Sequence, residues 1–490
     1  MEAATAGRRD FDHLREHSIG LPGVLFQSIT HMAPGAAVAY SIYISVTHAG
    51  PALPLAVGLA LIACLLAANS IGQLAKELPS AGGLYTYAAR TLGPYVGFVV
   101  AWLFLLFEPL VAPFLFLECG WAMTEVMKDE VGWDYSGQWW IWVLLTAAIV
   151  FLLTYRDIRI STNAGIILGL FEIGVFTALA IWILITKAGD LNLQPFNPNH
   201  APEGAFTGVG KGMVFAILAF IGFEASAPLG EEAKHPRRTI PLAVVGSCLI
   251  IGAFYVFMSY AWVFGEGFNQ FVDKAGGSAD PWREMAKVFW GAGWVLVFAA
   301  IINSIIANSN AGFNAATRVY YAMARNGIAP RALARTHPTF KTPYVATIVN
   351  TILAVSIALL LGWKWGALNG FVIIATAATI VVILVYMLVM LGSIRFYLTE
   401  KRASFNVFLH LIFPIAGIIL FAFPLYYQYQ PLPPYPIRNA AWFAIAWVAA
   451  GLVLGLVMWR MRPDALRAAE RIYVEDETVA PARAEPLPAD

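Results

Sequence analysis

Long apolar segments alternate with short polar segments along almost the whole chain. A helix that spans a bilayer needs about 20 mostly apolar residues, and twelve segments of the sequence approach or exceed that length. They lie near 24–47, 52–72, 94–125, 139–155, 160–186, 209–230, 239–264, 284–322, 344–362, 367–394, 404–424 and 439–459. The pattern therefore predicts an all-α integral membrane protein with twelve transmembrane helices.

The composition agrees with this class. Only 12% of the 490 residues are charged and 59% are hydrophobic, whereas soluble domains average about 25% charged residues. The formal net charge of +1 does not favour a nucleic-acid partner. The three cysteines, Cys64, Cys119 and Cys248, lie in apolar segments without metal-ligand spacing. Neither a disulfide framework nor a metal site is expected, and no cofactor is indicated.

The distribution of lysine and arginine predicts the orientation in the membrane. If the N-terminus is cytoplasmic, the loops on that side hold most of these residues, so both termini are predicted to be cytoplasmic. Residues 1–22 are polar and lack an apolar signal-peptide core, so no cleaved signal peptide is expected. Residues 463–490, rich in alanine, proline and glutamate, are expected to form a disordered cytoplasmic tail. The short loops suit the inner membrane of a bacterium.

Two of the predicted helices are interrupted. The first contains "SITHMAPGAAVAYSI", with Pro34 and Gly35 near its middle, and the sixth contains "AFIGFEASAPLG", with Gly222 and Pro228. Lipid cannot satisfy the backbone groups that a broken helix frees, so such breaks must face protein or a water-filled cavity. Interruptions at matching places in two five-helix halves point to a secondary transporter with inverted repeats. The alternative is an ordinary proline kink in each helix.

Three segments resemble the amino acid–polyamine–organocation superfamily of transporters. They are "FIGFEASAPLGEEAKHPRRTIPLA" at the sixth helix, "ELPSAGGLYTYAARTLGP" after the second, and "RVYYAMARNGIAPRALARTHPTFKTP" at the end of the eighth. The resemblance covers roughly residues 18–460. It implies a LeuT-like fold with helices 1 and 6 discontinuous, inverted repeats at about 23–190 and 205–395, and peripheral helices at about 403–460, all within a transporter domain of residues 23–462.

The resemblance also implies a substrate site at the two breaks. The matching positions are Ala33, Pro34, Gly35 and Ala36 in the first break and Phe220, Ile221, Gly222 and Phe223 in the second. Many members carry G-[ST]-G at the first break, where amides hold the substrate carboxylate, but Pro34 has no N–H. Either the Gly35 and Ala36 amides suffice, or the carboxylate is held less firmly, or the substrate lacks one.

Four glutamates fall inside predicted helices, where an ionised acid is costly and is by default a candidate functional residue. Glu224 follows the second break and either contacts the substrate or caps freed amides. The resemblance implies that Glu108 lies on the substrate face of the third helix, where an acid favours a second amine; the alternative is a protonated, hydrogen-bonded residue beside Pro109. Glu118 is interpreted as a residue at the membrane boundary. Glu172 is a candidate proton carrier, or a hydrogen-bonding partner of helix 8.

The eighth helix is unusually polar, with "INSIIANSNAGFNAATR". By resemblance, Asn308 and Ser309 lie near a sodium position of the family, which keeps sodium coupling open; polar contacts between helices are the other interpretation. His31 is either a packing residue or a proton carrier. Tyr85 and Tyr87 resemble a cytoplasmic gate, or are interfacial aromatics.

We therefore expect a permease, not an enzyme, that moves an amino acid or related amine by alternating access. Proton-coupled uptake is the first hypothesis; an obligate exchanger and a sodium-coupled symporter are the alternatives, followed by a nutrient sensor on a transporter fold. The eight histidines are scattered apart from His13 and His17, which have H-x-x-x-H spacing in the polar N-terminal segment, and G-x-S-x-G does not occur. Residues 220–226 are expected to form the transport site, and 231–241 a positively charged anchor beside it.

Overall fold

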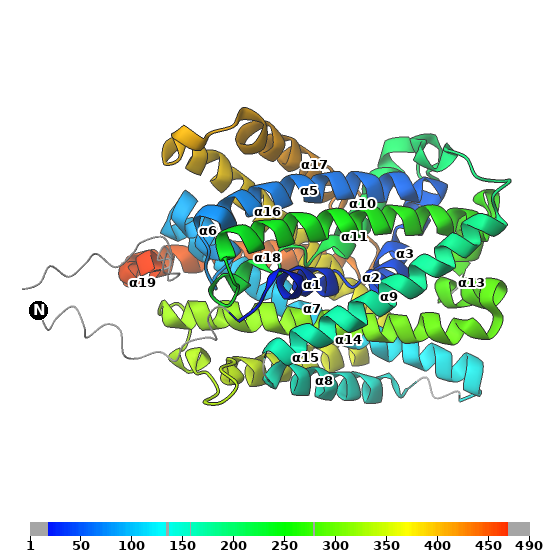
Figure 1. Cartoon of the computed structure of the whole chain (residues 1–490), viewed down its shortest axis with the longest axis horizontal. Coiled ribbons are helices and arrows are strands. Elements are labelled where there is room, and N and C mark those ends of the chain that lie inside the picture. The colour runs from blue at the N-terminus through cyan, green and yellow to red at the C-terminus, as the bar shows by residue number, and fades with distance from the viewer. Residues whose placement is uncertain (1–17, 134–136, 157, 278–279, 469–490) are drawn as a thin grey trace, which may run out of the picture.

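The computed structural model describes residues 18–133, 137–156, 158–277 and 280–468, and nearly all of this part of the chain is helical (Figure 1). The first half contains α1 (Leu21–His31), α2 (Pro34–Ala36), α3 (Ile42–Ile44), α4 (Val46–Ala49), α5 (Leu53–Glu77), α6 (Leu84–Leu92), α7 (Pro94–Val131), α8 (Trp139–Tyr155) and α9 (Ile158–Thr186). The second half contains α10 (Ala205–Phe220), α11 (Pro236–Glu266), α12 (Phe271–Gly277), α13 (Pro281–Trp290), α14 (Trp294–Arg325), α15 (Tyr344–Trp365), α16 (Ala367–Thr399), α17 (Phe413–Tyr427), α18 (Arg438–Met461) and α19 (Pro463–Ala468).

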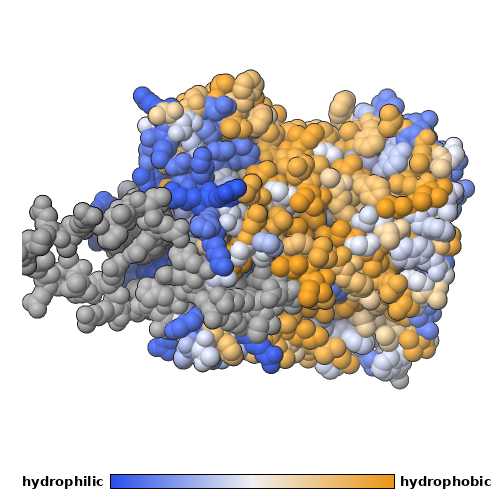
Figure 2. All heavy atoms as spheres, in the orientation of Figure 1, coloured by the Kyte–Doolittle hydropathy of each residue, from blue (hydrophilic) through white to orange (hydrophobic). Residues whose placement is uncertain are grey.

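Nine helices of the described part are long and apolar enough to cross a membrane, and α8 and α10 are shorter apolar helices. Hydrophobic residues cover the middle of the face shown in Figure 2, while hydrophilic residues gather mainly at the end that carries α6 and α19. The chain is therefore a multi-pass membrane protein. We call the end with α6 and α19 the N-terminal end of the bundle, and the end with α13 the opposite end (Figure 1).

Both interrupted helices are discontinuous, as predicted. The first helix ends at His31 and resumes at Pro34, after Ala33 adopts a left-handed conformation with φ 50°. A π-helix over Ala37–Ser41 continues it. The sixth helix, α10, stops at Phe220, and a short 3₁₀ helix over Ala227–Glu231 follows the break. Gly222 has φ +118°, a conformation that glycine adopts at little cost because it has no Cβ.

Two expected elements differ in the structure. The predicted helix at 284–322 is divided: α13 ends before Gly291, which has φ +53°, and α14 begins at Trp294. The apolar pattern continues through this bend, so hydropathy alone did not reveal it. Residues 463–468, placed in a disordered tail, form α19, which packs on α7. The rest of that tail, and residues 1–17 of the expected cytoplasmic segment, lie outside the described residues.

Equivalent helices of the two expected repeats pack against each other. α5 packs along α11, α7 along α14, and α8 along α15. These are the second and seventh, third and eighth, and fourth and ninth predicted membrane helices. Such pairing is what interlocked halves would produce, and the repeats with their bounds stay a prediction. α1 and α2 lie between these elements in the middle of the bundle (Figure 1).

Candidate functional site at the two helix breaks

The breaks of the first and sixth membrane helices touch each other. The hydroxyl of Ser28 donates a 2.8 Å hydrogen bond to the carbonyl of Phe223 and accepts one of 3.1 Å from the amide of Ser226. Gly222 lies so close to His31 that a Cβ at this position would be 2.6 Å from the imidazole. The structure thus brings together the two breaks, which are almost 190 residues apart in the sequence.

Tyr255 of α11 connects the two breaks. Its hydroxyl lies within hydrogen-bonding distance of two carbonyls, that of Met32 before the first break and that of Ala219 before the second, the latter at 3.0 Å. A phenol has one hydrogen and therefore donates to one carbonyl at a time. Its ring also packs edge-on against Phe220. Tyr255 thus satisfies backbone groups that the breaks leave free.

The amides of the first break are largely occupied or missing. The Ala33 amide donates to the carbonyl of Thr30 at 3.1 Å, and Pro34 has no N–H. The Gly35 amide donates to Oε2 of Glu172 at 3.3 Å. Glu172 on α9 is fully buried, so its carboxyl group sits at the start of the resumed helix in place of an external anion.

His31 and Glu108 form a buried pair beside the breaks. Nε2 of His31 lies 3.2 Å from Oε1 of Glu108, and both side chains are at most 1% exposed. Nδ1 of the same imidazole lies 3.4 Å from the carbonyl oxygen of Asn308. Because that oxygen only accepts hydrogen bonds, it favours a hydrogen on Nδ1. The Nε2–Oε1 contact then requires one further proton, held by either the imidazole or the carboxyl group.

Glu224 has one oxygen engaged and one facing polar neighbours. Its Oε2 accepts the amide hydrogen of Gly222 at 3.1 Å, and the phenol of Tyr386 lies beside its carboxyl group. The ring of Phe223 packs against Tyr386, with the ring centres 5.1 Å apart. Glu224 therefore caps the broken helix through one oxygen, which does not exclude a contact with substrate through the other.

A narrow cavity lies between the breaks and the opposite end of the bundle. Its lining residues come from α1, the first break, α2 and the π-helix after it, from α7, from the end of α10 and from α14; they include His31, Ala33, Ala36, Glu118, Ile221 and Asn308. The space admits little more than a water molecule, so this conformer is closed around it. Of the expected substrate-binding residues, Ala33, Ala36 and Ile221 line it. The other seven are not part of the lining: Pro34, Gly35, Phe220, Gly222, Phe223, Glu108 and Glu224.

The expected sodium position on α14 is occupied by internal contacts. The hydroxyl of Ser309 donates to the carbonyl of Ile305 at 2.8 Å. The carbonyl oxygen of Asn308 faces the imidazole of His31, and the side chain of Asn303 donates to the carbonyl of Leu168 at 2.9 Å. These polar groups thus tie α14 to α1 and α9 in this conformer.

The three sequence segments that carry the family resemblance meet at the N-terminal end. Arg318 of α14 forms a buried two-contact ion pair with Glu232, at 2.6 and 3.2 Å. Arg325 binds Glu231 in the same manner, at 2.6 and 2.9 Å, and the Glu231 carboxylate also accepts the amide of Ala81 at 3.2 Å. The segment 231–241, expected to be a positively charged anchor, is instead held at its start by two acids that bind basic residues of α14; of its bases, Arg237 donates to the carbonyls of Lys76 and Glu77.

This network closes the N-terminal end below the breaks. The amides of Ser18 and Ile19 donate to the carbonyl of Glu232 at 2.8 and 3.1 Å. Asn326 donates a 2.7 Å hydrogen bond to the hydroxyl of Tyr85, one of the two expected gate tyrosines. Tyr85 and Tyr87 are both fully buried on α6. Their burial differs from the exposure that an interfacial aromatic would have, and the gate role of the two tyrosines stays a prediction.

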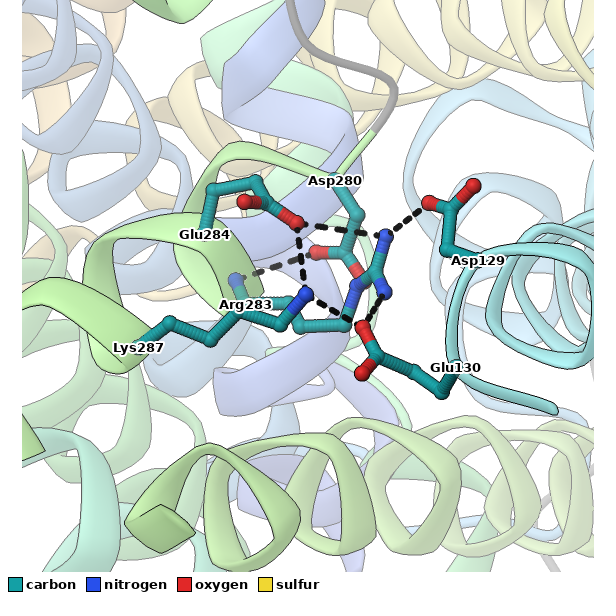
Figure 3. A network of polar contacts seen from close by, with 6 residues as sticks. All are labelled: Asp129, Glu130, Asp280, Arg283, Glu284 and Lys287. Carbon is teal, nitrogen blue, oxygen red and sulfur yellow. Dashed lines mark hydrogen bonds and ion pairs between the residues drawn. The ribbon is translucent and has the colours of Figure 1, made fainter. Parts of the chain in front are cut away.

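A second charged network joins α13 to the end of α7 at the opposite end (Figure 3). Arg283, 2% exposed, contacts Asp129 at 2.6 Å, Glu130 at 2.5 Å and Asp280 at 3.3 Å. Lys287 contacts Glu130 and Glu284. The network holds four acids and two bases. It fastens the short helix α13 across the end of α7.

Sequence reasoning missed several residues of this region. Tyr255 and Tyr386 have no sequence signal, because tyrosine is common in membrane helices. Glu118, interpreted as a boundary residue, lines the cavity and is 1% exposed. Its presence in an apolar stretch of α7 was the available signal.

The sequence is similar to those of known transporters. A family model described as amino acid permease matches residues 19–459. The chain is 27% identical over 376 residues to the low-affinity putrescine importer PlaP of Escherichia coli (strain K12), covering 75% of this chain and 79% of that protein. It is 28% identical over 345 residues to the branched-chain amino acid permease BcaP of Bacillus subtilis, covering 65% and 70%. It is 27% identical over 345 residues to the serine/threonine exchanger SteT of Bacillus subtilis, covering 69% and 74%.

Proposed function

Because this chain belongs to the amino acid permease family, whose named relatives are transporters and not enzymes, we propose that it takes up an amino acid or related amine coupled to protons. The transport is by alternating access across the inner membrane of a bacterium, with both termini in the cytoplasm. The substrate lies at the meeting point of the two helix breaks. Ala33 to Ala36 and Phe220 to Glu224 surround it, with Glu108 behind.

The buried pair of His31 and Glu108 is the observation that carries proton coupling. Nε2 of His31 and Oε1 of Glu108 are 3.2 Å apart, and both side chains are out of contact with solvent. Because Nδ1 carries the hydrogen that faces the Asn308 carbonyl, a hydrogen bond between Nε2 and Oε1 requires one further proton. A proton bound next to the substrate cavity is available to couple to the opening of either end. Glu172 is the second candidate carrier, because a carboxyl group accepts the Gly35 amide hydrogen whether or not it is protonated.

Proton coupling has more support than sodium coupling. Sodium prefers several oxygen ligands converging on one point, and the hydroxyl of Ser309 and the carbonyl of Asn308 are both directed at protein groups. A sodium-coupled symporter remains the alternative in which these oxygens turn to the ion. The gate proposal rests on Tyr85 and its hydrogen bond from Asn326, with Tyr87 on the same helix.

An obligate exchanger is the second candidate function. It is supported by a relative that is named as an exchanger, and by the ion pairs that hold each end of the bundle in this conformer, Arg318 with Glu232 and Arg283 with Asp129. If only a loaded carrier can release these contacts, transport requires substrate on both sides. Under simple uptake, the empty carrier must also cross between the two states.

The test is uptake by purified protein in proteoliposomes. A panel of radiolabelled neutral, acidic and cationic amino acids and polyamines is offered with an inward proton gradient, with sodium, or with neither. Each condition is run with and without internal substrate. We expect uptake that exceeds that of empty liposomes and rises with the proton gradient. Uptake that needs internal substrate would favour exchange, stimulation by sodium alone would favour the symporter, and no transport under any condition would contradict the proposal.

A further inference from the structure

Glu118 presents an unsatisfied carboxyl group to the central cavity. It lies on α7, is 1% exposed, and belongs to the lining that also includes Ser41, Leu115 and Ala219. Its Oε1 atom has no hydrogen-bond partner among the described residues. Burying such a group without a partner is costly, because the lost hydration is not replaced. A natural occupant of this position therefore supplies hydrogen-bond donors, and an ammonium group supplies three.

The cavity offers little to a carboxylate. Among its described lining residues there is no lysine or arginine, and the single basic side chain, His31, is already paired with Glu108. The backbone at the first break is equally restricted. Pro34 has no amide hydrogen, and the Gly35 amide is bonded to Glu172. The Glu172 carboxyl group thus occupies the position at which the N-terminus of the resumed helix would otherwise bind an anion.

The second break adds acceptors. The Glu224 and Glu108 carboxyl groups are not part of the lining, and they lie next to Gly222 and His31, respectively. A substrate with a negative group would be placed among three buried acids with no free cation to offset it. A substrate that carries only positive charge is instead attracted by these three acids.

We propose that this permease selects an organic amine that lacks a carboxylate, and that Glu118 binds its ammonium group. The inference rests on the proposed transport function and specifies its substrate. Glu118 is then a specificity-determining residue, not a residue at the membrane boundary. In the closed conformer the cavity is narrow, so the side chains around Glu118 separate when the substrate enters. Because Glu172 already accepts the Gly35 amide hydrogen, this amide does not bind the carboxylate of the corresponding amino acids, and these are excluded.

The first part of the test uses compounds that differ only by the carboxylate. In proteoliposomes, 1,4-diaminobutane is compared with ornithine, 1,5-diaminopentane with lysine, and 3-methylbutylamine with leucine. For at least one pair we expect the amine to be transported with a half-saturating concentration at least about tenfold lower than that of its amino acid. Amino acids transported as well as, or better than, the matching amines would overturn the inference while leaving transport itself established.

The second part tests Glu118. In Glu118→Gln, the half-saturating concentration for the amine is expected to rise about 10- to 100-fold, with the maximal rate nearly unchanged, because a charge-assisted hydrogen bond is lost. Glu118→Asp keeps the charge and is expected to recover part of the affinity. The matched control is Glu125→Gln, which makes the same change two turns along α7, at a partly exposed side chain outside the cavity lining.

The outcomes separate the two proposals. If Glu118→Gln, folded as judged by a single size-exclusion peak, behaves like Glu125→Gln, Glu118 does not bind the ammonium group. If Glu118→Gln lowers the maximal rate but leaves the half-saturating concentration unchanged, its role is structural and the inference fails. If neither amines nor amino acids move in the wild type, the proposed function fails, and this inference fails with it.

Discussion

Nε2 of His31 lies 3.2 Å from Oε1 of Glu108, between the first and third membrane helices of the bundle. The same imidazole touches the carbonyl of Asn308 on α14 and the backbone of Gly222 at the second break. One small buried ring of α1 therefore meets three other segments. Adding or removing its proton changes the contacts between α1, α7 and α14 together.

Replacing Glu108 by glutamine tests the coupling role of this pair. In Glu108→Gln we expect a proton gradient to lose its stimulation of uptake, because the amide cannot exchange a proton with His31. Exchange of labelled for unlabelled substrate, which needs no net proton movement, is expected to stay within about threefold of the wild-type rate. The comparison variant is Glu172→Gln, whose side-chain oxygen still accepts the Gly35 amide. Loss of the gradient effect in Glu172→Gln alone would transfer the coupling role to Glu172.

Breaking the Arg318–Glu232 pair tests closure of the N-terminal end. Both side chains are 1% exposed, and removing one partner of a buried ion pair costs about 3–5 kcal/mol. In Arg318→Met, amide hydrogen exchange in residues 18–31 and 222–233 is expected to accelerate on the order of 100-fold, because the closed conformer is destabilised.

The controls for Arg318 use the same end of the protein. Arg331→Met removes an exposed arginine and is expected to leave amide hydrogen exchange unchanged. The double variant Arg318→Met with Glu232→Met removes both charges and should restore much of the protection. If amide hydrogen exchange is as slow in Arg318→Met as in Arg331→Met, the Arg318–Glu232 pair does not hold this end closed.

Arg283 is predicted to hold α13 against α7. Its partners Asp129 and Glu130 are 44% and 21% exposed, so the loss is smaller than for Arg318. In Arg283→Gln, hydrogen exchange in residues 281–290 is expected to rise about tenfold, and high salt should raise it in the wild type in the same direction. Lys128→Gln, an exposed position on α7, is the control. An unchanged exchange rate in Arg283→Gln would mean that apolar packing alone fixes α13.

Gly222 is predicted to tolerate no side chain. Its φ of +118° is unfavourable for any other residue, and a Cβ would lie 2.6 Å from the imidazole and 2.7 Å from the backbone carbonyl carbon of His31. In Gly222→Ala we expect transport to fall to background, with strain of about 1–3 kcal/mol lowering the thermal midpoint. Gly174→Ala in α9, where no atom lies within 4 Å of the added methyl, should transport normally. Normal transport by Gly222→Ala would disprove the tight contact between the breaks.

The sequence by itself determined the class of the protein and the location of its breaks. Long apolar segments identify membrane helices because lipid excludes charge, and this property is local to each segment. Pro34 and Gly222 mark the breaks for an equally local reason, since proline lacks an amide hydrogen and glycine lacks a Cβ. The three family-like segments were also readable in the sequence, and they led to the family to which the chain belongs.

Only the tertiary structure decided which groups meet. Glu108 and Glu118 are ten residues apart on α7, about 15 Å along its axis and about 80° apart around it. Whether each faces lipid, a neighbouring helix or the cavity depends on how α7 is rotated and tilted, which neighbouring helices set. The pairing of His31 with Glu108, of Gly35 with Glu172 and of Arg318 with Glu232 joins residues 77 to 137 positions apart. A residue's type fixes what it is able to bind, and packing of the whole bundle fixes what it does bind.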